Sequence, residues 1–226
     1  MNKIILCLLS SNSIVNMALP SHIESQKENH PLSIKQQEEV NRRLFAAIKS
    51  RDLKKVKAAF QAHAEVNARN ASNNTPLIEA VRQGYGVYPI IKEIIAYKPD
   101  VNLKDTDGNT VLHIAAQDGD TKLITKLIVA GVHIDEKNNE GKTALMRAVE
   151  YKHEAIIKEL IKQGADVDLQ NGSNKTVYHY AESDLKVLQA IQDGLRAHQQ
   201  HETGVKQQVS EHLLKDITNM VSAYTL

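Results

Sequence analysis

The sequence has few aromatic residues, one cysteine and almost no net charge. Aromatic side chains make up 4% of the 226 residues and tryptophan is absent, a composition that suits a thin, mainly aliphatic core. Because Cys7 is the only cysteine, an intrachain disulfide and a cysteine-based zinc site are both excluded. The formal net charge of +1 gives no strong field that would attract nucleic acid or an anionic membrane surface, so we expect neither as a partner.

The motifs of the common catalytic and nucleotide-binding sites are also missing. The sequence contains no P-loop, no Gly-x-Gly-x-x-Gly after a strand and no Gly-x-Ser-x-Gly. His198 and His201 have a spacing that could place two metal ligands on one helical face, but no third ligand of a matching pattern follows. We therefore predict no catalytic residue, no metal site and no cofactor.

Four aspartates in the middle of the chain resemble a calcium-binding loop only superficially. Asp105, Asp107, Asp118 and Asp120 do not have the spacing of the EF-hand template. Asp107 is expected in a turn, and Asp120 is expected to cap a helix that begins at Thr121.

No apolar run is long enough to cross a membrane. Residues 1–20 read MNKIILCLLSSNSIVNMALP, where a lysine precedes a short apolar segment that serine then interrupts. This pattern predicts a signal peptide at 1–20 and a polar linker at 21–32. The alternative is a disordered or docked apolar N-terminus. The expected location is secreted or periplasmic, with a cytoplasmic location as the alternative.

Two adjacent segments of the chain are copies of one pattern. Residues 105–137 read DTDGNTVLHIAAQDGDTKLITKLIVAGVHIDEK, and residues 138–170 read NNEGKTALMRAVEYKHEAIIKELIKQGADVDLQ. The positions that recur 33 residues later are Thr110, Leu112, Ala115, Leu127, Gly131 and Ile134, which return as Thr143, Leu145, Ala148, Leu160, Gly164 and Val167. A fixed period of this length predicts a protein of stacked repeats.

Each unit is predicted to hold two short helices. A threonine caps the first helix, on which Leu112, Ala115 and Ala116 share one face. Gly131 and Gly164 are expected in the left-handed conformation that ends the second helix. One unit cannot bury both helix faces alone, so neighbouring units stack and bury them together.

The unit, with its turn, its Thr-x-Leu-His-x-Ala-Ala stretch and its Gly-x-x-Ile-Asp tail, resembles the ankyrin repeat. The resemblance covers about residues 42–196 and implies an all-α solenoid of helix-turn-helix units with short β-turn tips and extra capping helices at both ends. The expected divisions are an N-terminal helix with a capping repeat at 33–69, ankyrin repeats at 70–104, 105–137 and 138–170, a degenerate repeat at 171–202 and a capping helix at 203–226. The second unit is two residues longer than the others, and the extra length falls at residues 84–88.

The resemblance also implies which residues bind a partner. Ankyrin-like stacks usually hold a protein with the turn tips and first helices, which form a concave surface. On this chain the corresponding residues are Ser72, Arg82, Gln83, Thr106, Asp107, Asn109, Gln117, Asp118, Asn139, Glu140, Lys142, Glu150, Tyr151 and Lys175, with extra contacts from Tyr85 and Tyr88. The residues with an expected structural role are His113 and His179, which tie adjacent loops together, the capping threonines Thr75, Thr110, Thr143 and Thr176, and Gly131 and Gly164.

We therefore expect a non-catalytic, monomeric protein–protein interaction module with a protein partner that the sequence does not identify. Two alternatives remain open. One is a metal-dependent hydrolase that uses the scattered histidines, which stoichiometric zinc in the purified protein would favour. The other is a purely structural or chaperone-like scaffold in a bacterial envelope.

Overall fold

The computed structural model describes residues 32–84, 86–181 and 184–203. In these ranges every regular element is an α-helix, in agreement with the all-α solenoid that the repeats predict. The predicted signal peptide, nearly all of the predicted linker, Tyr85 and the predicted capping helix after residue 203 lie outside the described residues.

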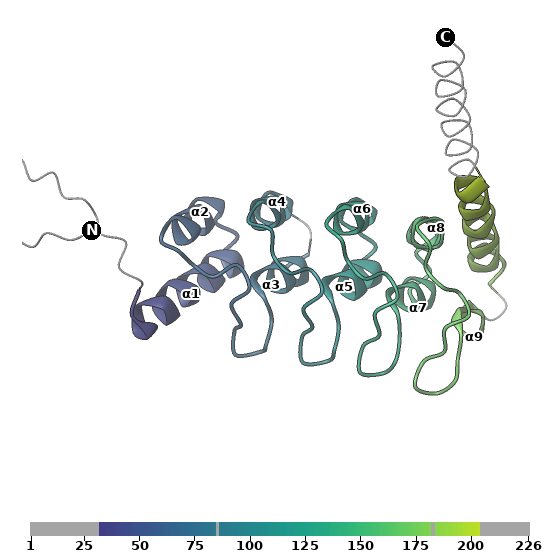
Figure 1. Cartoon of the computed structure of the whole chain (residues 1–226), viewed down its shortest axis with the longest axis horizontal. Helices are drawn as coiled ribbons and strands as arrows, with labels where there is room; N and C mark the ends of the chain where they lie inside the picture. Colours follow the sequence, from purple (N-terminus) through teal and green to yellow (C-terminus); the bar gives the residue numbers. More distant parts are fainter. Residues whose placement is uncertain (1–31, 85, 182–183, 204–226) are drawn as a thin grey trace, which may run out of the picture. The chain divides into compact units, whose positions relative to one another are not determined.

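The helices come in pairs, one pair to each unit, in the order of the chain (Figure 1). The helices of the first three units are α1 (Ile34–Lys49), α2 (Leu53–Gln61), α3 (Pro76–Arg82), α4 (Tyr88–Ala96), α5 (Val111–Asp118) and α6 (Thr121–Val129). Those of the last two are α7 (Ala144–Glu150), α8 (Glu154–Lys162) and α9 (Val177–Ala181), and residues 185–203 are also helical.

The helices within residues 33–203 form two rows, which Figure 1 shows from the side. The inner row runs α1, α3, α5, α7 and α9, and each of these helices packs against the next. The outer row contains α2, α4, α6 and α8. In this row α2 packs on α4 and α6 on α8, whereas α4 and α6 make the sparsest contact of the three consecutive pairs. The loops that precede α3, α5, α7 and α9 project from the inner row, on the side away from the outer helices (Figure 1).

A row of small residues lets the inner helices approach one another. Each inner helix places one alanine in the core at the same register, and these alanines are Ala47, Ala80, Ala115, Ala148 and Ala181, none more than 2% exposed. Larger aliphatic side chains, such as Leu77, Leu112 and Leu145, fill the space beside them and are 1% exposed. The core is thus thin and aliphatic, which is why the chain can fold with so few aromatic residues.

The helix boundaries follow local capping chemistry. Ser33 and Gln36 form a reciprocal capping box at the start of α1, and the Asp120 carboxylate caps α6 by accepting the backbone N–H of Leu123. At the unit ends, Gly131 and Gly164 have the expected positive φ, of 84° and 95°. His63 and Lys98 occupy the equivalent positions with φ of 65° and 52°. Their backbone N–H groups donate to the carbonyl oxygens of Phe60 and Ile95 in the preceding helical turn, so the helix end keeps this conformation even where glycine is absent.

Candidate functional site

Four loops with one geometry carry the predicted tips of the concave surface. We call residues 70–74, 105–109, 138–142 and 171–175 the tip loops. In each, the side-chain Oδ1 of the first residue accepts the backbone N–H groups of the third and fifth residues at 2.8–3.0 Å. The fourth residue has a positive φ in every loop, being asparagine in the first and last and glycine in the middle two. We call the first residues, which organise the loops, the tip-loop anchors. They are Asn70, Asp105, Asn138 and Asn171.

Sequence reasoning missed these four anchors, because it attributed the turns to the glycines alone. The available signal is an aspartate or asparagine that recurs three positions before the turn glycine. Side chains of these two types close a turn on their own backbone. Each tip loop is therefore rigid before it meets any partner.

Successive tip loops are joined to one another. The backbone N–H of Asn139 donates to the carbonyl oxygen of Asp107 at 3.0 Å, and that of Gly172 donates to the carbonyl oxygen of Glu140 at 2.9 Å. The side-chain amide of Asn139 also donates to the carbonyl oxygen of Thr106 at 3.0 Å. These bonds hold the exposed side chains of units three, four and five in fixed rows.

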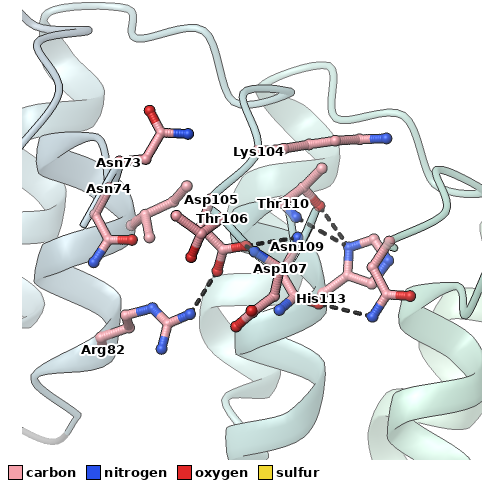
Figure 2. Close-up of polar contacts among 12 residues, drawn as sticks. Asn73, Asn74, Arg82, Lys104, Asp105, Thr106, Asp107, Asn109, Thr110 and His113 are labelled. Atoms are coloured by element: carbon pink, nitrogen blue, oxygen red, sulfur yellow. Dashed lines mark hydrogen bonds and ion pairs between the residues drawn. The ribbon is translucent and has the colours of Figure 1, made fainter. Parts of the chain in front are cut away.

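An ion pair with a buried carboxylate joins unit two to the tip loop of unit three (Figure 2). The guanidinium of Arg82, at the end of α3, donates to Oδ2 of Asp105 at 2.5 Å. The Asp105 side chain is fully buried, while that of Arg82 is 40% exposed. Arg82 therefore fixes the tip loop with one side of its guanidinium and leaves the other side accessible.

His113 makes the corresponding link between units three and four. Its Nδ1 accepts the backbone N–H of Thr110 at 3.2 Å, so the proton of a neutral ring lies on Nε2. That Nε2–H group donates to the carbonyl oxygen of Lys142 at 3.0 Å. His179 repeats the bond from Thr176 but is exposed, and no partner for its Nε2 lies within the described residues. The imidazole at this position ties loops together only where a further tip loop follows.

This geometry makes the stability of the stack depend on the protonation of His113. Burial lowers the pKa of His113 below its ordinary value of 6.5, although the hydrogen bond to Lys142 acts in the opposite direction. The unfolded chain therefore takes up the proton more readily, and stability is lost as the pH falls from 6.5 towards the lowered pKa of the folded state.

We expect His113→Gln to reduce this pH dependence. Glutamine is a capping-box residue and preserves the bond at Thr110, but it does not titrate. At about pH 7 the variant should lose about 1–2 kcal/mol of unfolding free energy with the cross-unit bond. When the pH is lowered from about 7 to about 5, the unfolding free energy of the variant should fall by less than that of the parent. Urea unfolding of both proteins at both pH values measures the difference. If the unfolding free energies of parent and variant fell by the same amount over this pH range, the pH dependence would not come from His113.

Comparison with known proteins agrees with the stacked units. A family model described as ankyrin repeats in three copies matches residues 85–171 and 112–193. The chain is an ankyrin-repeat protein. A protein of Dictyostelium discoideum, described as a probable serine/threonine-protein kinase, is 32% identical over 94 residues, which cover 38% of this chain and only 11% of that protein. Ankyrin repeats are generally non-catalytic modules for protein–protein interaction.

The structure separates the predicted binding residues of this ankyrin-repeat protein by exposure. Gln83 and Gln117 are half-buried. The exposed residues are Ser72, Arg82, Thr106, Asp107, Asp118, Asn139, Glu140, Glu150, Tyr151 and Lys175. They lie on the tip loops and at the ends of α3, α5 and α7, which is the surface that the ankyrin resemblance implies.

Two of the predicted contact residues are corrected by their burial. Asn109 is 6% exposed, and its side-chain oxygen accepts from the amide of Asn138 at 2.9 Å, so it fastens two tip loops together. Lys142 is 9% exposed, and its ammonium group binds Glu140 at 2.8 Å and Glu150 at 3.0 Å. Burial alone would lower the pKa of Lys142, but its hydrogen bonds to the two glutamates raise it. Both side chains are therefore occupied by the repeat stack itself.

Glu79 is a polar residue on the inner row that the sequence reasoning overlooked. It is 7% exposed, and its carboxylate accepts from the side-chain amides of Asn70 at 2.9 Å and Asn74 at 3.0 Å. At the start of α4, directly after the longer loop of the second unit, Tyr88 is half-buried with the Lys126 ammonium 5.7 Å from its ring centre. Pro89 stands in the first turn of α4, where its missing N–H removes no helical hydrogen bond.

The hydrolase alternative gains no support from the arrangement of the histidines. In the described part of the chain, no three side chains of His, Cys, Asp or Glu are grouped so that they could hold a metal ion. The Nδ1 of His198 instead bonds the carbonyl oxygen of Lys162 at 3.1 Å.

Among the described helices, none has the length and apolar character needed to span a membrane.

Proposed function

We propose that this ankyrin-repeat protein binds a protein partner through the concave surface formed by its tip loops and the ends of its inner helices. The observation that carries the proposal is the bonded row of tip loops. Their backbones are fixed by their own anchors and by one another, so the exposed side chains at their tips are preorganised. A preorganised surface avoids the entropy cost of ordering loops when a partner binds.

The side chains on this surface fit recognition better than a structural role. Asp107 and Tyr151 are exposed, and Tyr151, at the end of α7, is 46% exposed. Tyrosine is enriched among the residues that dominate binding energy at interfaces. The scaffold alternative needs no such side chains on a rigid inner face.

Site-specific crosslinking tests which face binds. A photoreactive amino acid would replace Asp107 or Tyr151 on the concave side, and Val129 or Lys162 on the exposed outer helices in control variants. The expected result is a defined adduct from the two concave positions and none from the outer ones. Adducts from the outer positions alone would place the binding surface elsewhere.

Removing exposed concave side chains should weaken binding without unfolding the stack. The triple variant Asp107→Ala/Glu140→Ala/Tyr151→Ala removes little buried surface, and Lys142 keeps its bond to Glu150. We expect affinity for the crosslinked partner to fall at least about tenfold, or about 1.4 kcal/mol. Calorimetric titration measures the affinity, and circular dichroism checks the fold.

The matched control for that experiment changes the outer helices. The variant Val129→Ala/Glu154→Ala/Lys162→Ala also replaces three exposed side chains, and it should bind as the parent does. If the concave variant bound normally while folded, or if the control lost as much affinity, the proposed surface would be wrong.

A further inference from the structure

One of the four tip-loop anchors starts the only Asn-Gly pair of the sequence, Asn171–Gly172. Asparagine is a thermally labile residue, and it deamidates most readily before glycine, because glycine has no side chain to hinder the attack of its backbone nitrogen. The other asparagine anchors, Asn70 and Asn138, precede alanine and asparagine. Asn171 is therefore the anchor at which deamidation is chemically easiest.

Deamidation at this pair requires a new bond between two neighbouring groups. The backbone nitrogen of Gly172 loses its proton and attacks the side-chain carbon Cγ of Asn171, while the bond from Cγ to Nδ2 breaks. The side-chain nitrogen leaves with the released proton as ammonia, and a five-membered succinimide ring remains. Water then opens the ring at either carbonyl carbon, which gives aspartate or isoaspartate.

The Asn171 side chain is held by three hydrogen bonds. Its Oδ1 accepts the backbone N–H groups of Ser173 and Lys175, both at 2.9 Å, and its Nδ2 donates to the hydroxyl of Tyr180 at 2.6 Å. The two donors polarise the carbonyl, which on its own would favour attack at Cγ. Ring closure must bring Cγ onto the Gly172 nitrogen, however, so the bonds that fix the side chain have to loosen. Protection therefore depends on the loop staying closed.

The Gly172 nitrogen is engaged by the tip loop of the fourth unit. Its N–H donates to the carbonyl oxygen of Glu140 at 2.9 Å, so the proton that the reaction must remove is shared with a protein group. The same oxygen lies 3.0 Å from the place of a Cβ atom on Gly172, so the two loops are in close contact. A base in solution removes this proton readily only after the bond has opened.

We propose that Asn171 is a modification site, converted to aspartate or isoaspartate when the tip loops of the fourth and fifth units separate. The bond from Gly172 to Glu140 is the gate. While it is closed, the nitrogen keeps its proton and the side chain keeps its three bonds. The inference does not rest on the proposed function, because no partner takes part in the reaction.

The two products differ in their effect on the tip loop. Aspartate preserves it, because Asp105 anchors the equivalent loop of the third unit by accepting the N–H groups of Asp107 and Asn109. Isoaspartate adds the side-chain carbon to the main chain and moves the anchoring carboxylate, so the loop cannot close with the same bonds. Conversion to isoaspartate thus releases Lys175, an exposed residue of the concave surface, from its fixed row.

The test follows deamidation of Asn171 in the full-length chain at mildly alkaline pH. After digestion, peptide mass spectrometry with fragmentation that separates aspartate from isoaspartate measures the rate, and the same chain in guanidinium chloride gives the rate without the gate. We expect the folded chain to react at least about tenfold more slowly, and the Gly172 N–H to be protected in native-state hydrogen exchange. Equal rates in the folded and unfolded chains, or an unprotected Gly172 N–H, would overturn the proposal.

Two variants separate the opening of this gate from general unfolding. Gly141→Ala places a Cβ atom 2.5 Å from the Gly172 nitrogen and forces the two loops apart, so Asn171 should react at least about threefold faster than in the parent. Ala115→Leu, in the core of the third unit, also lowers stability but leaves the gate in place, and its rate should match that of the parent. Circular dichroism checks that both variants are folded under these conditions. If Gly141→Ala reacted at the rate of the parent, or if both variants reacted equally faster, the assignment of the gate would be wrong.

Discussion

Gly141→Ala should lower the free energy of unfolding much more than Gly131→Ala, although both glycines have a positive φ, of 73° and 84°. Alanine in the left-handed region costs about 1–2 kcal/mol at either position. A Cβ atom at Gly131 would meet nothing within 4 Å. At Gly141 it would lie 2.5 Å from the backbone nitrogen of Gly172 and 3.0 Å from the carbonyl carbon of Asn171. A backbone cannot rotate away as a side chain can, so the two tip loops must separate.

That separation breaks a bond of the tip-loop row. The N–H of Gly172 donates to the carbonyl oxygen of Glu140, the residue next to the new methyl group. We expect Gly131→Ala to cost about 1–2 kcal/mol, and Gly141→Ala at least about 2 kcal/mol more, from the contact and the lost bond together. Urea unfolding of both variants, followed by circular dichroism, measures the difference. Equal midpoints would show that the tip loops adjust freely and are not rigid.

The period of the sequence predicted the stack because each repeated residue has a local reason to recur. Threonine caps a helix, alanine permits close packing and glycine ends a helix, and none of these effects needs knowledge of a distant partner. The tip-loop anchors have an equally local signal in Asp105 and Asn138. Sequence reasoning misses them when it treats glycine as a sufficient cause of the turn.

The burial of Asn109 and Lys142 could not be read from the sequence in the same way. Both occupy the fifth position of a tip loop, and both are polar, which is typical of an exposed residue. Their burial depends on what the neighbouring unit supplies, which is Asn138 for Asn109 and Glu150 for Lys142.

The inner-row alanines lead to a second large effect, for Ala148→Leu. Ala148 is fully buried on α7, which packs against α5, α8 and α9. A leucine adds three carbon atoms where no helix can move without disturbing a neighbouring unit. Overpacking of this kind costs about 1–3 kcal/mol, and the equivalent change at Ala115, also fully buried, should cost a similar amount.

The control for Ala148→Leu is Ala155→Leu, which makes the same substitution at an exposed position of α8. Alanine and leucine have similar helix propensities, so this variant should stay within about 0.5 kcal/mol of the parent. Urea midpoints measure all three variants under one condition. If the urea midpoint of Ala148→Leu matched that of the parent, the inner helices would have room to separate. The close approach of the units, which keeps the tip loops within hydrogen-bonding distance, would then need another cause. If it unfolds early while Ala155→Leu does not, the alanine row sets the spacing of the units, and with it the spacing of the side chains on the concave surface.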